Sequence, residues 1–189
     1  RSATRARWGI GSGEVVVGHL ANLSAEKGTP ELLTAADRVR RTGIPVRVVL
    51  AGPRMPSFER FWRRTEPDGW VTLLGPVSDA EKREFFAGID VFALPSVSDS
   101  FGLVFLEAWA NGVPVIGYRA GGVADVIRHE QDGLLVRCGD LDGLTAALRQ
   151  LSMDEMTRAK WGTAGRERIG REFRWIDKLR IAEQAITHW

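Results

Sequence analysis

Short apolar runs alternate with longer helical segments along this chain, and this alternation strongly limits the folds that are open to it. Six runs are rich in β-branched or other apolar residues and are typical of buried strands. The connections between strands and helices are short. This pattern predicts an α/β fold: a doubly wound six-stranded parallel sheet with right-handed crossovers and helices on both faces. The predicted strands cover residues 14–20, 45–51, 70–74, 90–94, 114–116 and 134–136.

The helical segments between these strands carry several recognisable start signals. Thr29 can cap a helix that has Pro30 at its first position. Ser78 and Glu81 match a capping box, and we expect a helix from there to about residue 87. A second capping box is predicted at residues 152–155. Further helices are predicted at residues 57–65, 101–110, 123–127, 144–151 and 175–189.

Composition narrows the class of protein. Hydrophobic residues make up 44% of the 189 residues and the net charge is +2, a weak balance that does not favour nucleic acid as a partner. Cys138 is the single cysteine, which excludes an internal disulfide, and the three histidines show no metal-ligand spacing. No apolar run approaches the ~20 residues that span a bilayer. We expect a cytoplasmic domain over residues 14–189, preceded by a linker stub at residues 1–13, and we expect the chain to be part of a longer protein.

Two carboxylates bracket the start of the helix after the fourth strand. Asp99 lies in a polar loop, whereas Glu107 lies in an otherwise apolar segment, residues 101–110, apart from Gly102. We therefore expect this helix to be buried nearly all round. The backbone N–H groups of residues 100–103 lack partners within the helix, so they form a place for a phosphate. The pair predicts a site for an elongated, phosphate-centred ligand with hydroxyl groups at both ends.

In a doubly wound sheet, ligands bind beyond the carboxyl ends of the strands where the strand order switches. The loops after the first and fourth strands, which contain Lys27 and Asp99, are expected to face that crevice. Lys27 lies just before a helix start, where the helix dipole favours anions. It therefore fits a phosphate contact better than a contact with the helix, although a solvated loop lysine is the alternative.

Structural alternatives exist for the other candidates as well. A buried charge costs several kcal/mol without a partner, so Glu107 is either a ligand for vicinal sugar hydroxyls, an exposed helix residue, or one half of an ion pair with an arginine. Asp99 could be an ordinary helix N-cap. His19 ends a strand, and we interpret it as a hydrogen-bonded core histidine.

The candidate residues occur in the order of a known signature. Residues 95–102 (PSVSDSFG), 107–115 (EAWANGVPV) and 121–125 (GGVAD) resemble the donor-domain signature of retaining GT-B glycosyltransferases of family GT4, the glycosyl transferases group 1 type. Residues 21–28 (ANLSAEKG) resemble a family loop that also ends in Lys-Gly. The resemblance covers about residues 14–189. It implies a Rossmann-like domain, the C-terminal half of a GT-B fold, including a C-terminal crossover helix.

The resemblance also implies a function. It implies a retaining, metal-independent glycosyltransferase of the hexosyltransferase type, which takes a UDP-, GDP- or other nucleotide diphosphate sugar and needs no further cofactor. Lys27 would hold the pyrophosphate, Glu107 the ribose hydroxyls, and Asp99 the hydroxyls of the transferred sugar. The loop ending at Val77 would line the base. The implied substrate-binding residues are Asn22, Lys27, Val77, Asp99, Ser100, Phe101, Gly102, Leu103 and Glu107, with Asp99 and Lys27 as catalytic candidates and no metal ligand.

Two positions depart from the family pattern. Asp99 stands where the family has a glutamate, and Asn22 stands where it has a phosphate-binding arginine, which removes a charge-assisted contact. Two other interpretations therefore stay open: a non-catalytic nucleotide-sugar-binding or interaction module, and a GT-B-type epimerase or phosphorylase. The implied partners are the nucleotide-sugar donor and a missing N-terminal GT-B domain, without which we expect no turnover. Peripheral contact with a membrane through the full-length enzyme is a further expectation.

Overall fold

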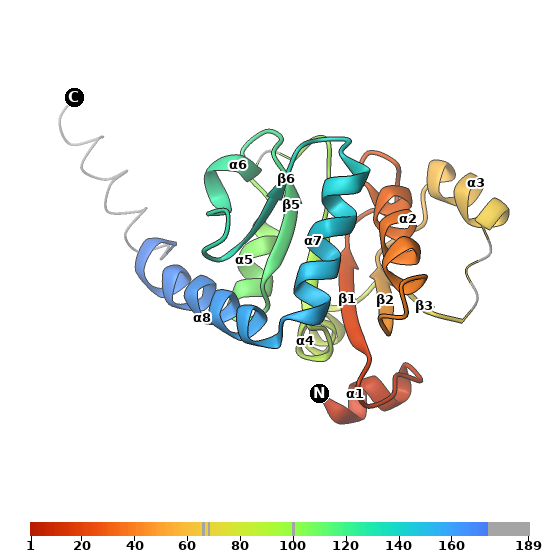
Figure 1. Cartoon of the computed structure of the whole chain (residues 1–189), viewed down its shortest axis with the longest axis horizontal. Helices are drawn as coiled ribbons and strands as arrows, with labels where there is room; N and C mark the ends of the chain where they lie inside the picture. Colours follow the sequence, from red (N-terminus) through yellow and green to blue (C-terminus); the bar gives the residue numbers. More distant parts are fainter. Residues whose placement is uncertain (66, 68, 100, 174–189) are drawn as a thin grey trace.

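The computed structural model describes residues 1–65, 67, 69–99 and 101–173. One sheet of six parallel strands runs through the molecule in the order β3-β2-β1-β4-β5-β6 (Figure 1). The predicted doubly wound α/β fold is thus confirmed, and the strand order switches between β1 and β4. The strands are β1 (Val15–Leu20), β2 (Val46–Ala51), β3 (Val71–Gly75), β4 (Val91–Leu94), β5 (Val115–Tyr118) and β6 (Gly133–Val136).

Helices cover both faces of this sheet. One core lies under α2, α3 and α7, and the other lies under α4, α5 and α6. β4 and β5 are buried along their whole length, as expected for central strands of a parallel sheet. The helices are α1 (Ser2–Arg7), α2 (Thr29–Arg40), α3 (Pro56–Thr65), α4 (Asp79–Gly88), α5 (Leu103–Ala110), α6 (Val123–Val126), α7 (Leu141–Met153) and α8 (Glu155–Glu172).

The helix starts test the predicted caps. The capping box of Ser78 and Glu81 is present at the start of α4. The cap predicted at Thr29 is wrong, because α2 starts from Gly28 in a left-handed conformation and Thr29 is buried. The capping box predicted at residues 152–155 is also wrong. α7 continues through that point to Met153, and the carboxylate of Asp154 caps α8 by accepting a hydrogen bond from the backbone N–H of Thr157.

The linker stub predicted at residues 1–13 contains a helix that the sequence did not reveal. α1 packs against α4, and Arg5 donates to the carbonyl of Gly88 at 2.8 Å and to the carboxylate of Asp90 at 2.5 Å. The indole of Trp8 occupies the space where a Cβ on Gly88 would lie, only 2.4 Å from the ring. This segment therefore packs on the same unit as the sheet. The last predicted helix, residues 175–189, lies outside the described residues.

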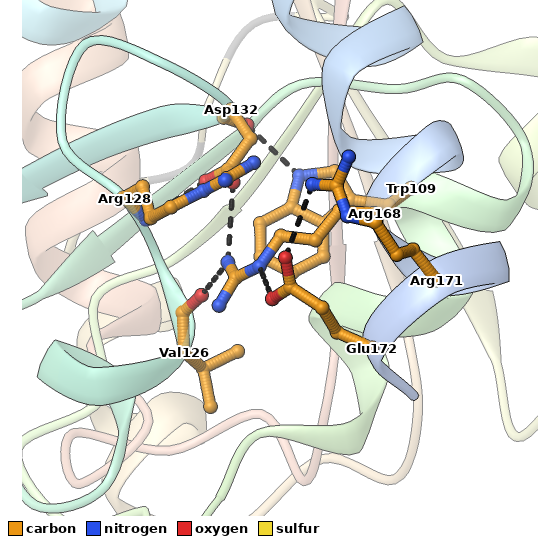
Figure 2. Close-up of polar contacts among 7 residues, drawn as sticks. All are labelled: Trp109, Val126, Arg128, Asp132, Arg168, Arg171 and Glu172. Atoms are coloured by element: carbon orange, nitrogen blue, oxygen red, sulfur yellow. Dashed lines mark hydrogen bonds and ion pairs between the residues drawn. The ribbon is translucent and has the colours of Figure 1, made fainter. Parts of the chain in front are cut away.

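A buried ionic network joins α8 to the body of the domain (Figure 2). The carboxylate of Asp132 is fully buried and accepts from Arg128 at 2.7 Å and from Arg168 at 3.1 Å. The indole N–H of Trp109 in α5 donates to the carbonyl of Asp132 at 2.8 Å. The guanidinium of Arg168 also donates to the carbonyl of Val126 and lies over the ring of Trp109. These contacts fix the C-terminal part of α8 against α5 and the segment around α6.

Candidate functional site

The loops after β1 and β4 lie against each other at the carboxyl edge of the sheet. The N–H of Val97 donates to the carbonyl of Glu26 at 3.0 Å. Gly28 approaches Pro95 so closely that a Cβ on it would lie 2.0 Å from the Pro95 carbonyl oxygen. Since Gly28 also has a φ of +68°, both its conformation and its surroundings favour glycine. The two loops that we expected to face the crevice are therefore joined at the switch point of the sheet.

This contact brings Lys27 and Asp99 together. The ammonium of Lys27 lies 3.0 Å from the carbonyl oxygen of Ser98 and 3.3 Å from the Asp99 carboxylate. The other oxygen of that carboxylate accepts a hydrogen bond from the backbone N–H of Gly102 at 2.8 Å. Gly102 itself is the N-cap residue of α5, so Asp99 supports the helix start from three residues before it. A third loop closes on this turn, because a Cβ on Gly121 would lie 2.4 Å from the carbonyl oxygen of Asp99.

The predicted phosphate-binding backbone lies around the same helix start. Phe101 is 40% exposed and Leu103 is 64% exposed, so both face the solvent beside Asp99. Gly102 adopts a left-handed conformation and begins α5 without a side-chain cap. Ser100 lies outside the described residues. The carboxylate of Asp99 therefore links the start of α5, through the N–H of Gly102, to the ammonium of Lys27.

The prediction that α5 is buried nearly all round is wrong. Its buried residues are Phe105, Ala108 and Trp109. Leu103 is exposed and the side chain of Glu107 is 39% exposed, so the helix presents an open face. The apolar residues on this face made the sequence look like that of a fully buried helix. The carboxylate of Glu107 thus lies at the surface of the domain rather than in its core.

Glu107 forms an ion pair, and its partner is a lysine rather than an arginine. The ammonium of Lys82, on α4, donates to Oε1 of Glu107 at 2.7 Å. Lys82 is 31% exposed, which leaves the pair accessible from solvent. Sequence reasoning missed Lys82 because it lies 25 positions before Glu107 in the sequence, with the strand β4 between their two helices. Its position directly after the capping box of Ser78 and Glu81 was the only signal in the sequence that placed it on a rigid helix.

Two predicted residues lie apart from these contacts. Asn22 is exposed in the loop after β1. The backbone N–H of the next residue, Leu23, donates to the carbonyl of Pro53 at 2.8 Å. Val77 is half-buried in the loop before α4. Within the described part of the chain, no hydrogen bond or ion pair joins either residue to Lys27, Asp99 or Glu107. The described residues also contain no group of three or more His, Cys, Asp or Glu side chains that could hold a metal ion.

His19 lies beneath the two joined loops, as a core residue. It is fully buried, and its Nδ1 and Nε2 lie 2.9 Å from the carbonyl oxygen of Ala93 and 3.0 Å from the hydroxyl of Thr29. The pKa of His19 is lowered to about 4, chiefly by burial and to a smaller extent by the charge of Lys27, against the opposing effect of the Ala93 hydrogen bond. The neutral ring therefore joins β1, β4 and the start of α2 below the candidate site.

Comparison with known protein families shows which family this chain belongs to. The family model described as glycosyl transferases group 1 matches residues 1–168. The chain belongs to that family. Curated relatives of this group 1 chain include a GDP-mannose-dependent alpha-(1-6)-phosphatidylinositol monomannoside mannosyltransferase of Mycobacterium tuberculosis, 32% identical over 93% of this chain and 48% of the relative. A D-inositol 3-phosphate glycosyltransferase of Pseudarthrobacter chlorophenolicus is 35% identical over 87% of this chain and 40% of the relative. The chain thus spans about half the length of these curated relatives.

Solved structures show the same fold. The sucrose-phosphate synthase of Thermosynechococcus elongatus matches all of the group 1 chain with a TM-score of 0.83 and 26% identity, over 50% of that protein. The Anabaena protein HepE, solved in complex with UDP-glucose, matches 98% of the chain with a TM-score of 0.86 and 24% identity, over 52% of that protein. A C-terminal domain of a glycosyl transferase group 1 family protein from Francisella tularensis matches 93% of each chain with a TM-score of 0.76 and 21% identity. These neighbours are GT-B glycosyltransferases, and the chain corresponds to their C-terminal domain.

Within the described residues, every helix is too short or too polar to cross a bilayer.

Proposed function

We propose that this chain is the donor-binding domain of a retaining, metal-independent glycosyltransferase. A nucleotide diphosphate sugar would bind in the crevice at the carboxyl ends of β1 and β4. The observation that carries this proposal is the position of the Lys27 ammonium, 3.3 Å from the carboxylate of Asp99, whose other oxygen accepts from the backbone N–H of Gly102 at the start of α5. A cation and the N–H groups at a helix start together attract a diphosphate.

The same groups would stabilise the leaving group. When the bond between the sugar and the diphosphate breaks, negative charge accumulates on the diphosphate. Lys27 and the N–H groups at the start of α5 would already be oriented toward that charge, which is the kind of stabilisation that contributes most to many enzymatic rates. Lys27 donates to the carbonyl of Ser98 and to the carboxylate of Asp99. We expect the lysine to keep its place in the loop and to share its three donors with the diphosphate.

The two carboxylates would bind the two ends of the nucleotide-sugar donor. Asp99 would accept hydrogen bonds from the transferred sugar, and Glu107 would accept them from the ribose hydroxyls. Asn22 and the backbone around residues 100–103 would complete the diphosphate site, and the loop ending at Val77 would line the base. The support for this order is the order of the elements, because Asp99 precedes α5 and Glu107 lies on its open face.

The known relatives and neighbours are associated with more than one donor. The mycobacterial relative is named for GDP-mannose, whereas the Anabaena structure contains UDP-glucose. We therefore propose a nucleotide diphosphate hexose without choosing the base. Because the chain spans about half of its relatives, we propose that an N-terminal domain supplies the acceptor side, with residues 1–13 leading into the donor domain of residues 14–189. We place the full-length enzyme in the cytoplasm, in peripheral contact with a membrane, since the mycobacterial relative is named for a lipid acceptor.

Titration calorimetry with UDP-glucose and GDP-mannose tests this proposal. One of the two should bind saturably to the chain, and Lys27→Met and Glu107→Ala should each weaken binding by about tenfold or more, because each removes a charged hydrogen bond. Glu155→Ala, an exposed carboxylate at the start of α8, is the matched control and should leave the affinity unchanged. A chelator of divalent cations should also leave it unchanged. No saturable binding of either sugar, or equal affinities in all variants, would contradict the proposed site.

A further inference from the structure

We propose that Lys82 is a positioning residue that orients the carboxylate of Glu107 for the ribose hydroxyls of the donor. This inference rests on the proposed function, since it takes Glu107 as the group that binds the ribose. It adds a residue that the family signature does not contain and that the contact between α4 and Glu107 reveals.

Lys82 is held on a well-fixed helix start. The backbone N–H of Ser78 donates to the carboxylate of Glu81 at 2.7 Å, which closes the capping box of α4. The N–H of Lys82 makes the next helical bond, to the carbonyl of Ser78 at 2.8 Å. Further along α4, Phe85 is buried in the same core cluster as Phe105 of α5. Ammonium and carboxylate are therefore presented by two elements that are fixed relative to each other, as a precise site requires.

The ion pair is specific for Glu107. Lys82 also has Asp79 on its own helix as a possible partner, but that carboxylate is 91% exposed and lies 3.9 Å away, against 2.7 Å for Glu107. Ion pairs as open as this one contribute little to folding stability. The ion pair between Lys82 and Glu107 therefore adds little to the attachment of α4 to α5. Its main effect is on the orientation of the Glu107 carboxylate.

Orientation matters because a ribose presents two neighbouring hydroxyl groups. A carboxylate that accepts one hydroxyl on each of its oxygens must be turned so that both oxygens face the ribose, and a free glutamate loses side-chain entropy when it is held that way. Lys82 bonds to Oε1 of Glu107 within the domain itself. Oε2 and the remaining lone pair of Oε1 are left to accept from a ligand. Such preorganisation raises affinity by reducing the entropy lost on binding.

The placement of α4 fits this role. The loop of residues 75–77, which we expect to line the base, ends immediately before Ser78 at the cap of α4. Lys82 follows one helical turn later and points to Glu107. The base loop and the residue that orients the ribose carboxylate are thus parts of one continuous segment, and the ribose is the part of a nucleotide that lies next to the base.

The test compares a nucleoside diphosphate with its 2′,3′-dideoxy analogue. UDP, GDP and ADP are titrated into the 189-residue chain, and the tightest binder is used with its analogue. Glu107→Gln should abolish most of the preference for the ribose form. Lys82→Met should reduce that preference by about tenfold while leaving the affinity for the analogue nearly unchanged, and Lys82→Arg should restore it in part. In the double variant the loss should equal that of Glu107→Gln alone, since Lys82 acts through Glu107.

Arg83→Met is the matched control, because it removes an exposed cation from the same turn of α4. The melting temperatures of all variants establish that each is folded. If Glu107→Gln abolishes the preference but Lys82→Met does not, the inference about Lys82 is wrong and the ribose site stands. If Glu107→Gln leaves the preference intact, the proposed role of Glu107 is wrong. If none of the three nucleotides binds to the unchanged chain, both the proposed function and the inference are contradicted.

Discussion

His19 shows how a single residue connects the core to the candidate site. Its ring bonds to β4 through the carbonyl of Ala93 and to the start of α2 through Thr29, directly after the loop that carries Lys27. Both bonds suit a neutral ring, in which one nitrogen donates and the other accepts. Protonation inside the core would place an uncompensated charge near Lys27, so the neutral form belongs to the folded state.

The stability of the domain should therefore fall in mild acid. The pKa of His19 is lowered to about 4 in the folded state and is near 6.5 when unfolded, so the unfolded state takes up the proton first. The contribution is fully present above pH 6.5 and is lost as the pH falls toward 4. Between pH 7 and pH 5 the chain should lose about 2 kcal/mol more unfolding free energy than His19→Gln. Urea denaturation at both pH values measures this difference, and parallel losses in the two proteins would refute it.

For single residues, the sequence indicated some hydrogen-bonding and ion-pair environments correctly and missed others. The prediction that His19 is a hydrogen-bonded core residue is confirmed. It could be made because a histidine at the end of an apolar strand is expected to lie in the core. For Glu107 the sequence allowed an ion pair with an arginine, whereas the cation in the structure is Lys82. Lys82 reaches it only through the relative placement of two helices. That placement depends on packing in the core, where the ring of Phe92 contacts both Phe86 of α4 and Phe105 of α5, and no spacing rule expresses such contacts.

Among the elements, α8 depends most on polar contacts. Few of its side chains are buried, and its attachment includes the ionic network around Asp132 (Figure 2). A buried carboxylate is stabilised only while its partners remain. Asp132 has two cationic partners, Arg128 on its own segment and Arg168 on α8, and only the second joins the helix to the rest of the domain.

Removing Arg168 should consequently destabilise the domain strongly. Arg168→Met leaves Asp132 buried with only Arg128 as a cationic partner, and should lower the unfolding free energy by about 3 kcal/mol. Arg171→Met, which removes a 66% exposed cation from the same end of α8, should change it by less than about 0.5 kcal/mol. Hydrogen exchange should show the loss of protection first in α8. Equal effects of the two substitutions would mean that the network does not hold the helix.

The helix starts show which helix boundaries could be predicted from the sequence and which could not. Ser78 and Glu81 act locally, within four residues, and their capping box was predicted correctly. Residues 152–155 show the same residue pattern, yet the burial of Ser152 in the core keeps α7 helical through that point. α1 was missed because six residues without an apolar stripe carry no periodic signal, and its stability comes from contacts with Gly88 and Asp90.

At the scale of the whole molecule, the alternation of strands and helices was enough to predict a parallel sheet. The strand order, with β1 beside β4, could be expected only from the general rules of doubly wound folds, and it determines which loops meet. The positive-φ glycines Gly28 and Gly121 then allow the loops after β1, β4 and β5 to approach Asp99 or its neighbours. The open face of α5 was not predictable, because the apolar residues on it would be expected in a core.

The location of the ligand on this molecule can be measured by mapping backbone amide chemical shifts during a titration with UDP or GDP. The largest shifts should occur in the loop of residues 21–28, in residues 95–103 and around Glu107 on α5, at the carboxyl ends of β1 and β4 (Figure 1). Lys27→Met should reduce these shifts without moving them elsewhere. Saturable shifts confined to α3, to the β6 edge or to the opposite end of the sheet would contradict a donor site at the crevice.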